Sequence, residues 1–236
     1  MVNIRTISVD NMILEHDKIT KVAFDDYKNS PLYEGMKALA MEKKGSNREI
    51  NTLVAINFDF NKLQEKGLSI HGTEKLAPFD RIVLDAITTL FVSGQNKYIS
   101  TNMIFHIMTG DKNRRISPNY AEEINNSIAK LMCSQIIIKA NEEAIMYPKL
   151  KNFEYRSSIL PAEMVKAKLN GTEIACIRID REPPLYLYAN HKNQISKIEL
   201  ALIQKPFEGK IHENKESLTI LYYLVRRIIA LKRNMS

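Results

Sequence analysis

The sequence lacks the short patterns by which most enzymes are recognised. None of its five histidines lies within four residues of another, which excludes HExxH motifs and the closely spaced histidine pairs of metal-dependent nickases. P-loop, GxGxxG and GxSxG patterns are also missing, and the whole chain contains only eight glycines. The acidic pairs Asp25-Asp26 and Glu142-Glu143 are typical of loops and turns rather than of acid–base catalysis. We therefore expect a protein that is not an enzyme and holds no metal or cofactor.

Cysteine and long apolar runs are scarce as well. Cys133 and Cys176 lie far apart, each in an apolar segment, so they form no paired metal or redox motif. No stretch approaches the roughly 20 apolar residues of a membrane span. The beginning of the chain carries charges throughout, unlike a signal peptide. We expect a cytoplasmic protein with buried, inert thiols and no membrane partner.

The chain does have a moderate excess of positive charge. Lys and Arg number 34 and Asp and Glu 27, which gives a net charge of +7. Such an excess favours a polyanionic partner, although many basic proteins bind no specific polyanion. With 236 residues, of which 44% are hydrophobic, the chain is long enough for one large domain or two small ones.

Apolar spacing predicts a strand and a long helix in the first half. Apolar and polar residues alternate from Ile50 to Phe58, which is typical of a half-buried strand. Between Leu76 and Phe91 apolar residues recur at helical spacing, and we expect Gly94 to end this helix in a left-handed conformation.

The residues that follow predict an ordered series of short elements. A β-prone connector leads to a helix capped by Ser100 or Thr101, and Ser117-Pro118 begins a third helix. We expect a β-hairpin of 135–139 and 144–147 after it. The order helix, strand, helix, turn, helix and hairpin is typical of a winged helix-turn-helix domain. Generic packing of three helices beside a hairpin is the alternative.

The predicted fold class is α+β, with a winged-helix domain followed by a second mixed α/β region that ends in a long amphipathic helix. Strands are expected at 153–160 and 174–179, and a strand or helix at 195–203. The last helix covers residues 214–233. The predicted units are an N-terminal extension (1–48), the winged-helix domain (49–150) and a second domain (151–236) that is either separate or a partial second winged helix.

The segment TGDKNRR lies between the second and third helices and holds the first cluster of positive charge. We expect phosphate contacts from this turn, since each basic side chain adds salt-dependent affinity for nucleic acid. A solvated loop is the alternative. The predicted contact residues of the turn are Lys112, Asn113, Arg114 and Arg115.

The third helix is predicted to enter the major groove, where asparagine pairs with adenine. Glu122 and Glu123 near its start also suit the helix dipole, so a dimer face or a solvated surface is an alternative. The predicted contact residues on this helix are Asn119, Asn125, Asn126 and Lys130. His106 on the preceding helix is expected to be structural rather than a catalytic base.

Further basic residues lie outside these two elements. Lys139 belongs to the predicted wing, and a second basic cluster comprises Arg226, Arg227, Lys232 and Arg233. Arg226 and Arg227 are adjacent on a helix and therefore point in different directions. Lys232 and Arg233 also complement the dipole at the helix end, so stabilisation alone would explain them.

The stretch LAPFDRIVLDAITTLFVSGQNKYISTNMIFHIMTG resembles replication-initiator-type proteins of plasmids and integrative elements in low-GC Gram-positive bacteria. A second stretch, IDREPPLYLYANHKNQISKIELALIQKP, resembles the segment that follows the first winged helix in those proteins. The resemblance lies in apolar spacing, Pro183-Pro184 and Gln194-Ile195, not in catalytic signatures.

The resemblance implies a non-catalytic winged-helix protein that binds repeated double-stranded DNA sites sequence-specifically in replication initiation of a plasmid or mobile element. It also implies homo-oligomers that change between dimer and monomer, with replication proteins as further partners. No complete second winged helix follows the last helix, so we expect a short member of the group or part of a longer chain. The alternatives are a transcriptional regulator, a relaxosome accessory protein, and a protein–protein adaptor without nucleic-acid binding.

Overall fold

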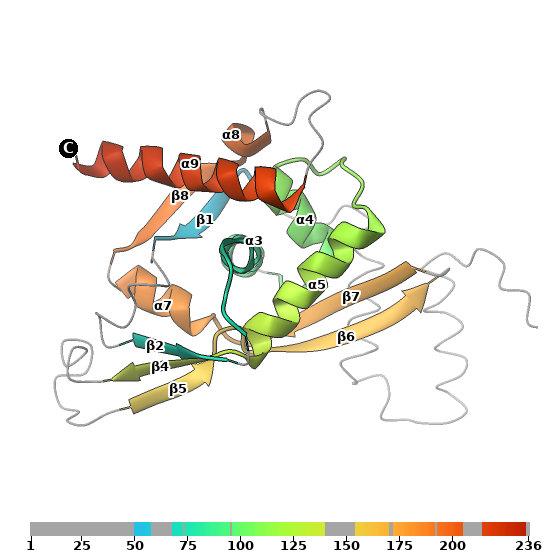
Figure 1. Ribbon diagram of the computed structural model, residues 1–236, viewed down its shortest axis with the longest axis horizontal. Coiled ribbons are helices and arrows are strands. Elements are labelled where there is room, and N and C mark those ends of the chain that lie inside the picture. The colour runs from blue at the N-terminus through green and yellow to red at the C-terminus, as the bar shows by residue number, and fades with distance from the viewer. Residues whose placement is uncertain are drawn as a thin grey trace, which may run out of the picture.

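The chain has a mixed α+β fold in the part that the structure describes. The computed structural model describes residues 50–57, 68–72, 74–94, 96–139, 154–169, 172–191, 193–204 and 214–234. These residues contain six helices and three small antiparallel sheets (Figure 1). No helix in these ranges combines the length and apolarity needed to cross a lipid bilayer. The predicted N-terminal extension lies outside them.

Helix α3 (Pro78–Val92) lies at the centre of the fold and confirms the first predicted helix (Figure 1). Eleven of its residues are buried, because α4, α5, α9 and β1 all pack around it. Proline at the first position suits a helix N-terminus. The Asp80 carboxylate accepts a hydrogen bond from the Ala77 backbone N–H at 2.6 Å, which satisfies one of the N–H groups at the helix start.

Gly94 follows α3 without the left-handed backbone that the sequence predicted. The residue that ends the helix, Ser93, is right-handed, and Gly110 is the left-handed glycine of the described residues. A Cβ on Gly94 would lie 2.6 Å from the Leu90 carbonyl oxygen. The prediction for Gly94 is therefore wrong: glycine is required there for close packing and not for its backbone angle.

Two further helices pack against α3. β3 (Tyr98–Ser100) leads into α4 (Thr101–Thr109), whose first turn is capped by the Ser100 hydroxyl, which accepts a backbone N–H at 3.2 Å. α5 (Pro118–Cys133) begins in the same way, with the Ser117 hydroxyl accepting a backbone N–H at 3.3 Å. Both predicted helix starts are confirmed.

The strands form three antiparallel sheets. β1 (Thr52–Ile56) pairs with β8 (Ile195–Glu199). β4 (Gln135–Lys139) lies between β2 (Leu68–His71) and β5 (Glu154–Ser158). β7 (Thr172–Ile179) lies between β3 and β6 (Ala162–Leu169). All three sheets join strands from both sides of residue 150, so the two predicted domains share sheets.

The prediction that residues 135–139 pair with 144–147 in a hairpin is wrong. Both edges of β4 are occupied, by β2 on one side and by β5 on the other. Residues 144–147 themselves lie outside the described residues. The hairpin beside α5 is instead β6–β7, in which Leu169 pairs with Thr172 (Figure 1). Asn170-Gly171 between these strands is a strong sequence signal for a two-residue hairpin turn and could have predicted it.

The second edge of β1 is covered by side chains of α3. The Val54 N–H donates to Thr89 Oγ1 at 2.8 Å, and the Ile56 N–H donates to Asp85 Oδ1 at 3.1 Å. Arg81 donates to the carbonyl oxygen of Ile56. Residues 81, 85 and 89 are four positions apart, so they form one row on the helix and follow the strand.

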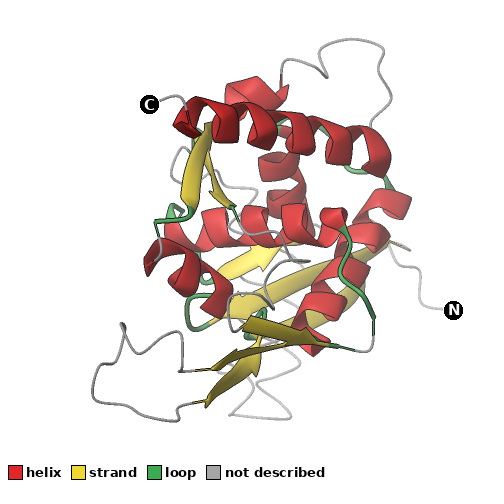
Figure 2. Ribbon diagram, turned by 60° about the vertical axis from the view of Figure 1, so that its left-hand side comes forward, coloured by secondary structure: helices red, strands yellow, loops and turns green. Residues whose placement is uncertain are grey.

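Three helices complete the fold. α7 (Pro184–His191) begins at the two adjacent prolines, and α8 (Leu200–Gln204) follows β8 directly. The segment for which a strand or a helix was expected therefore contains one of each. α9 (Lys215–Asn234) is the predicted amphipathic helix and lies across α3, with Leu218 and Tyr222 buried (Figure 2).

Candidate nucleic-acid interface

The turn between α4 and α5 is held by local hydrogen bonds. Gly110 ends α4 with a φ of 69°, a left-handed conformation that glycine adopts without steric cost. Asp111 Oδ1 accepts the Asn113 backbone N–H at 2.9 Å, which closes the turn that follows. The predicted contact residues here are the exposed Lys112, Asn113 and Arg115 and the half-buried Arg114. The turn therefore presents basic side chains from a defined backbone.

His106 connects α4 to this turn. Its Nε2 lies 3.2 Å from the carbonyl oxygen of Arg114, and the tautomer protonated at Nε2 donates a hydrogen bond to that oxygen. Burial lowers the pKa of His106, and this effect outweighs those of the Arg114 hydrogen bond and of the Asp111 charge, which raise it. The neutral imidazole is thus well suited to the structural role that the sequence predicted.

The outward face of α5 is polar but carries little positive charge. Asn119, Glu122 and Asn126 are exposed, at spacings of three and four residues that place them on one side of the helix. Their amides and carboxylate are available for hydrogen bonds. Cys133, at the end of the helix, is also exposed, so the expectation of a buried thiol is wrong there, whereas Cys176 is buried.

Asn125 lies on the inner side of α5. It is 2% exposed, and its Oδ1 accepts the Thr101 hydroxyl at 2.7 Å, which joins the middle of α5 to the start of α4. The neighbouring Ile124 and Ser127 are buried as well. The side chain of Asn125 belongs to the packing between the two helices, so it is poorly placed for the predicted contact with DNA.

Lys130 is bound to two carboxylates. Its Nζ lies 3.2 Å from Glu74 and 3.4 Å from Asp80, and its side chain is 23% exposed. Asp80 also accepts the Ser127 hydroxyl at 2.8 Å. Burial alone would lower the pKa of Lys130, but the charges of Asp80 and Glu74 outweigh it and raise the pKa. Its charge is compensated within the protein, so Lys130 is poorly suited to a phosphate contact.

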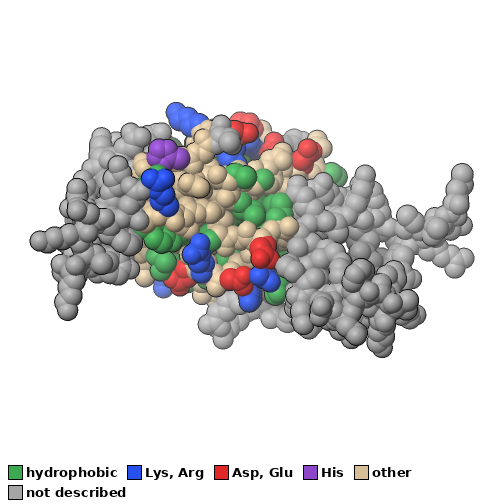
Figure 3. Space-filling view, turned by 90° about the horizontal axis from the view of Figure 1, so that it is seen from below, with side chains coloured by type: hydrophobic (Ala, Val, Ile, Leu, Met, Phe, Trp, Pro, Cys, Tyr) green, Lys and Arg blue, Asp and Glu red, His purple; other side chains and the backbone are tan. Residues whose placement is uncertain are grey.

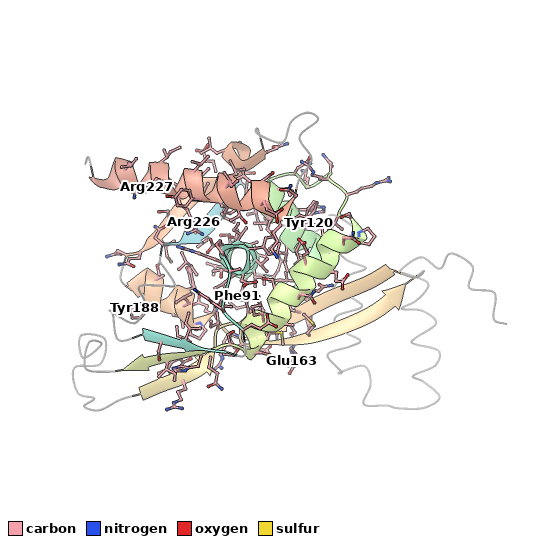
Figure 4. The ribbon with its side chains drawn as sticks, viewed as in Figure 1. Phe91, Tyr120, Glu163, Tyr188, Arg226 and Arg227 are labelled. Carbon is pink, nitrogen blue, oxygen red and sulfur yellow. The ribbon has the colours of Figure 1, made fainter. Side chains whose placement is uncertain are left out.

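Arg226 points into the molecule. It forms an ion pair with Asp85 and donates a hydrogen bond to the Ile56 carbonyl oxygen at 2.6 Å. Figure 4 shows it on the side of α9 that faces α3. The guanidinium is already bound within the protein, so Arg226 is poorly suited to the predicted nucleic-acid contact. The adjacent Arg227 is exposed, as expected for neighbours on a helix.

The two predicted basic clusters lie apart. Tyr222, near the middle of α9, donates to the Met108 carbonyl oxygen at 3.1 Å, just before the basic turn. Lys232 and Arg233 follow ten or more residues later, which is about 15 Å along a helix. Lys139 ends β4 and pairs in register with Glu154, in a different sheet. The backbone therefore places these residues on elements other than the turn.

The β6–β7 hairpin lies next to the candidate site, although the sequence predicted a wing at residues 135–147 instead. It extends beside α5 (Figures 1 and 2). At its base Arg178 pairs with Glu163 at 3.1 Å and with Asp180 at 3.0 Å, and Lys97 pairs with Asp180 at 2.9 Å. Seen from below, the described face has Lys and Arg side chains mixed with Asp and Glu (Figure 3). The base of the hairpin is therefore close to electrically balanced.

Within the described ranges, no group of three or more His, Cys, Asp or Glu side chains is arranged to hold a metal ion.

Comparisons with known proteins add no functional assignment. No protein-family model matches the chain, and no match was found among curated proteins or solved structures. The features that bear on function are therefore the turn, α5 and the β6–β7 hairpin.

Proposed function

We propose that the protein binds double-stranded DNA sequence-specifically through a winged helix made of α3, β3, α4, α5 and the β6–β7 hairpin. The observation that carries the proposal is the pairing of β3 with β7. A short strand after the first helix that pairs with a hairpin after the third is the arrangement of a winged helix. The hairpin lies beside α5, where a wing would contact the DNA backbone next to the groove.

In this proposal the turn and α5 have different tasks. Lys112, Arg114 and Arg115 lie directly before α5 and contact phosphates, which positions the helix. Asn119 and Asn126 face outward from α5, and their amides pair with adenine edges in the major groove. Affinity then comes mainly from the turn, and discrimination between sequences comes from the helix.

The biological role that we propose is replication initiation of a plasmid or mobile element. It is supported by the resemblance of residues 76–110 to initiator-type proteins. Transcriptional regulation and relaxosome assembly use the same DNA-binding surface and differ in the site that is bound. Footprinting on DNA that includes the repeats of a plasmid origin tests this: protection of the repeats supports replication, and protection of promoter DNA alone contradicts it.

The binding activity itself is tested by fluorescence anisotropy with labelled duplex DNA. We expect affinity to fall steeply between about 50 and 200 mM salt, because bound phosphates release counterions. A specific site should retain an advantage over random duplex at each salt concentration. Absence of binding, or binding that does not change with salt, would contradict the proposal.

A protein–protein adaptor is the second candidate. The observation that favours it is the outward face of α5, where Glu122 is exposed, Glu123 is half-buried and Lys130 is bound to two carboxylates. A DNA-reading helix usually offers basic side chains, whereas this face offers amides and acids. Glu122→Gln distinguishes DNA binding from the adaptor function. If α5 enters the groove, DNA affinity should rise, because the variant removes a negative charge that repels the phosphates.

A further inference from the structure

The outer side of α9 carries a second apolar row, opposite the side that packs against α3. Its members are Ile220 (59% exposed), Tyr223 (65%), Leu224 (51%), Ile228 (65%) and Leu231 (50%). Their spacings of one, three and four residues place them on one side of the helix. Figure 1 shows α9 in the upper part of the molecule, where it lies above α3.

We infer that this row is the contact between two copies of the chain. Single exposed apolar residues are common, but five neighbouring ones amount to a patch on the order of 500 Å². Two such patches bury about 1,000 Å² when they meet, which is about the smallest area expected of a biological interface and is typical of a weak dimer. The row runs from Ile220 to Leu231, so it is about 17 Å long on a helix of 20 residues.

An antiparallel pair of α9 helices makes the row complementary to itself. With a two-fold axis beside Leu224, this residue contacts its own copy, and Ile220 lies opposite the Ile228 of the partner copy. The match follows from the sequence, because Ile220 and Ile228 are each four residues from Leu224. In the antiparallel arrangement the positive end of each helix dipole lies beside the negative end of the other, which is favourable.

The charges on the same face as the row favour a second copy over a lipid surface. Glu216 and Arg227 are both exposed and lie about three helical turns apart, so they lie on one line along the helix, on the same face as the row. In the antiparallel pair, Glu216 of one copy lies about 8 Å along the axis from Arg227 of the other, within reach of two extended side chains. Anionic lipid would attract Arg227 but repel Glu216.

Sedimentation equilibrium of the full chain tests the contact. We expect the wild-type chain to dimerise as its concentration rises through the micromolar range, and Leu224→Glu to raise the dissociation constant at least about tenfold. Leu187→Glu is the matched control, since Leu187 is an exposed leucine (45%) on α7. It should leave the dissociation constant unchanged. Circular dichroism of both variants checks that each is folded.

A charge exchange tests the antiparallel arrangement separately. Glu216→Arg and Arg227→Glu should each weaken the dimer, and the two changes together should restore it. Failure of the double variant to recover overturns the antiparallel geometry. A wild-type chain that stays monomeric, a dimer unaffected by Leu224→Glu, or a monomer that binds anionic lipid vesicles through α9 overturns the proposal. Dimerisation through α9 does not depend on DNA binding. A failure of one is therefore distinguished from a failure of the other by sedimentation and anisotropy.

Discussion

Asp85 of α3 and Arg226 of α9 form a buried ion pair where both helices meet β1. The Asp85 side chain is completely buried, and that of Arg226 is 14% exposed. Both also bind the backbone of Ile56, Asp85 through the N–H and Arg226 through the carbonyl oxygen. One residue of β1 is therefore bound by a charged group from each helix, and α9 is fixed to the core of the fold.

Arg226→Ala should lower the free energy of unfolding by about 3–5 kcal/mol, because it leaves the Asp85 carboxylate buried without its partner. Urea denaturation followed by circular dichroism at one low protein concentration measures the change. Arg227→Ala, one residue further along, removes an exposed guanidinium and should change stability by no more than about 0.5 kcal/mol. Equal losses for the two variants would show that the ion pair adds nothing.

Arg114→Ala combined with Arg115→Ala should weaken binding to every duplex by a similar factor. The slope of log affinity against log salt should become shallower by about 1 for each phosphate contact that is lost. Anisotropy titrations at several salt concentrations provide both values. Lys197→Ala is the control, since Lys197 is an exposed lysine on β8. If the double variant and the control have the same slope, the turn does not contact phosphate.

Asn125 is buried and its neighbour Asn126 is exposed, so their alanine variants should affect different properties, stability for Asn125 and DNA discrimination for Asn126. Asn125→Ala removes the buried hydrogen bond between the Thr101 hydroxyl and Asn125 Oδ1, and it should lower the free energy of unfolding by about 1–3 kcal/mol. Asn126→Ala should leave stability unchanged but reduce discrimination between specific and random duplex by about 1–3 kcal/mol. The pair is compared by denaturation and by competition binding. A stability loss confined to Asn126→Ala would contradict this placement.

His106 should make stability depend on pH. Its folded pKa lies below the unfolded value of about 6.5, so the unfolded chain takes up the proton more readily. The stabilising contribution is therefore complete above the unfolded pKa and is lost as the pH falls towards the folded one. His106→Gln keeps an N–H donor for the Arg114 carbonyl and should flatten this dependence. Urea midpoints measured from about pH 7.5 to pH 5 compare the two proteins.

The helices α3, α4 and α5 could be predicted because their signals are local. Ser100 and Ser117 cap the helices that follow them, and the apolar spacing marks the side that faces the core. The role of Arg226 has a local signal too, since it lies four residues after the buried Tyr222. The identity of its partner does not, because Asp85 is far away in the sequence and only folding brings the two together.

The pairing of the strands was harder to predict than their positions. β4 was expected where it lies, but its neighbours β2 and β5 come from segments far before and after it. A strand pattern shows which residues alternate and does not show which other strand provides the partner. In the candidate site, the turn residues were expected at the surface and lie there, whereas Lys130 is held by Glu74 and Asp80, whose approach depends on the packing of α3 against α5.

The hydrogen bonds between α3 and β1 also affect how the protein behaves towards other chains. An unpaired strand edge exposes N–H groups that recruit further strands and lead to aggregation. In β1 the N–H groups of Val54 and Ile56 are bound by Thr89 and Asp85, so α3 takes the place of a neighbouring strand. The two-stranded sheet is thereby closed on this side to strand addition. Thr89 and Asp85 of α3 thus protect the protein against self-association through the edge of β1.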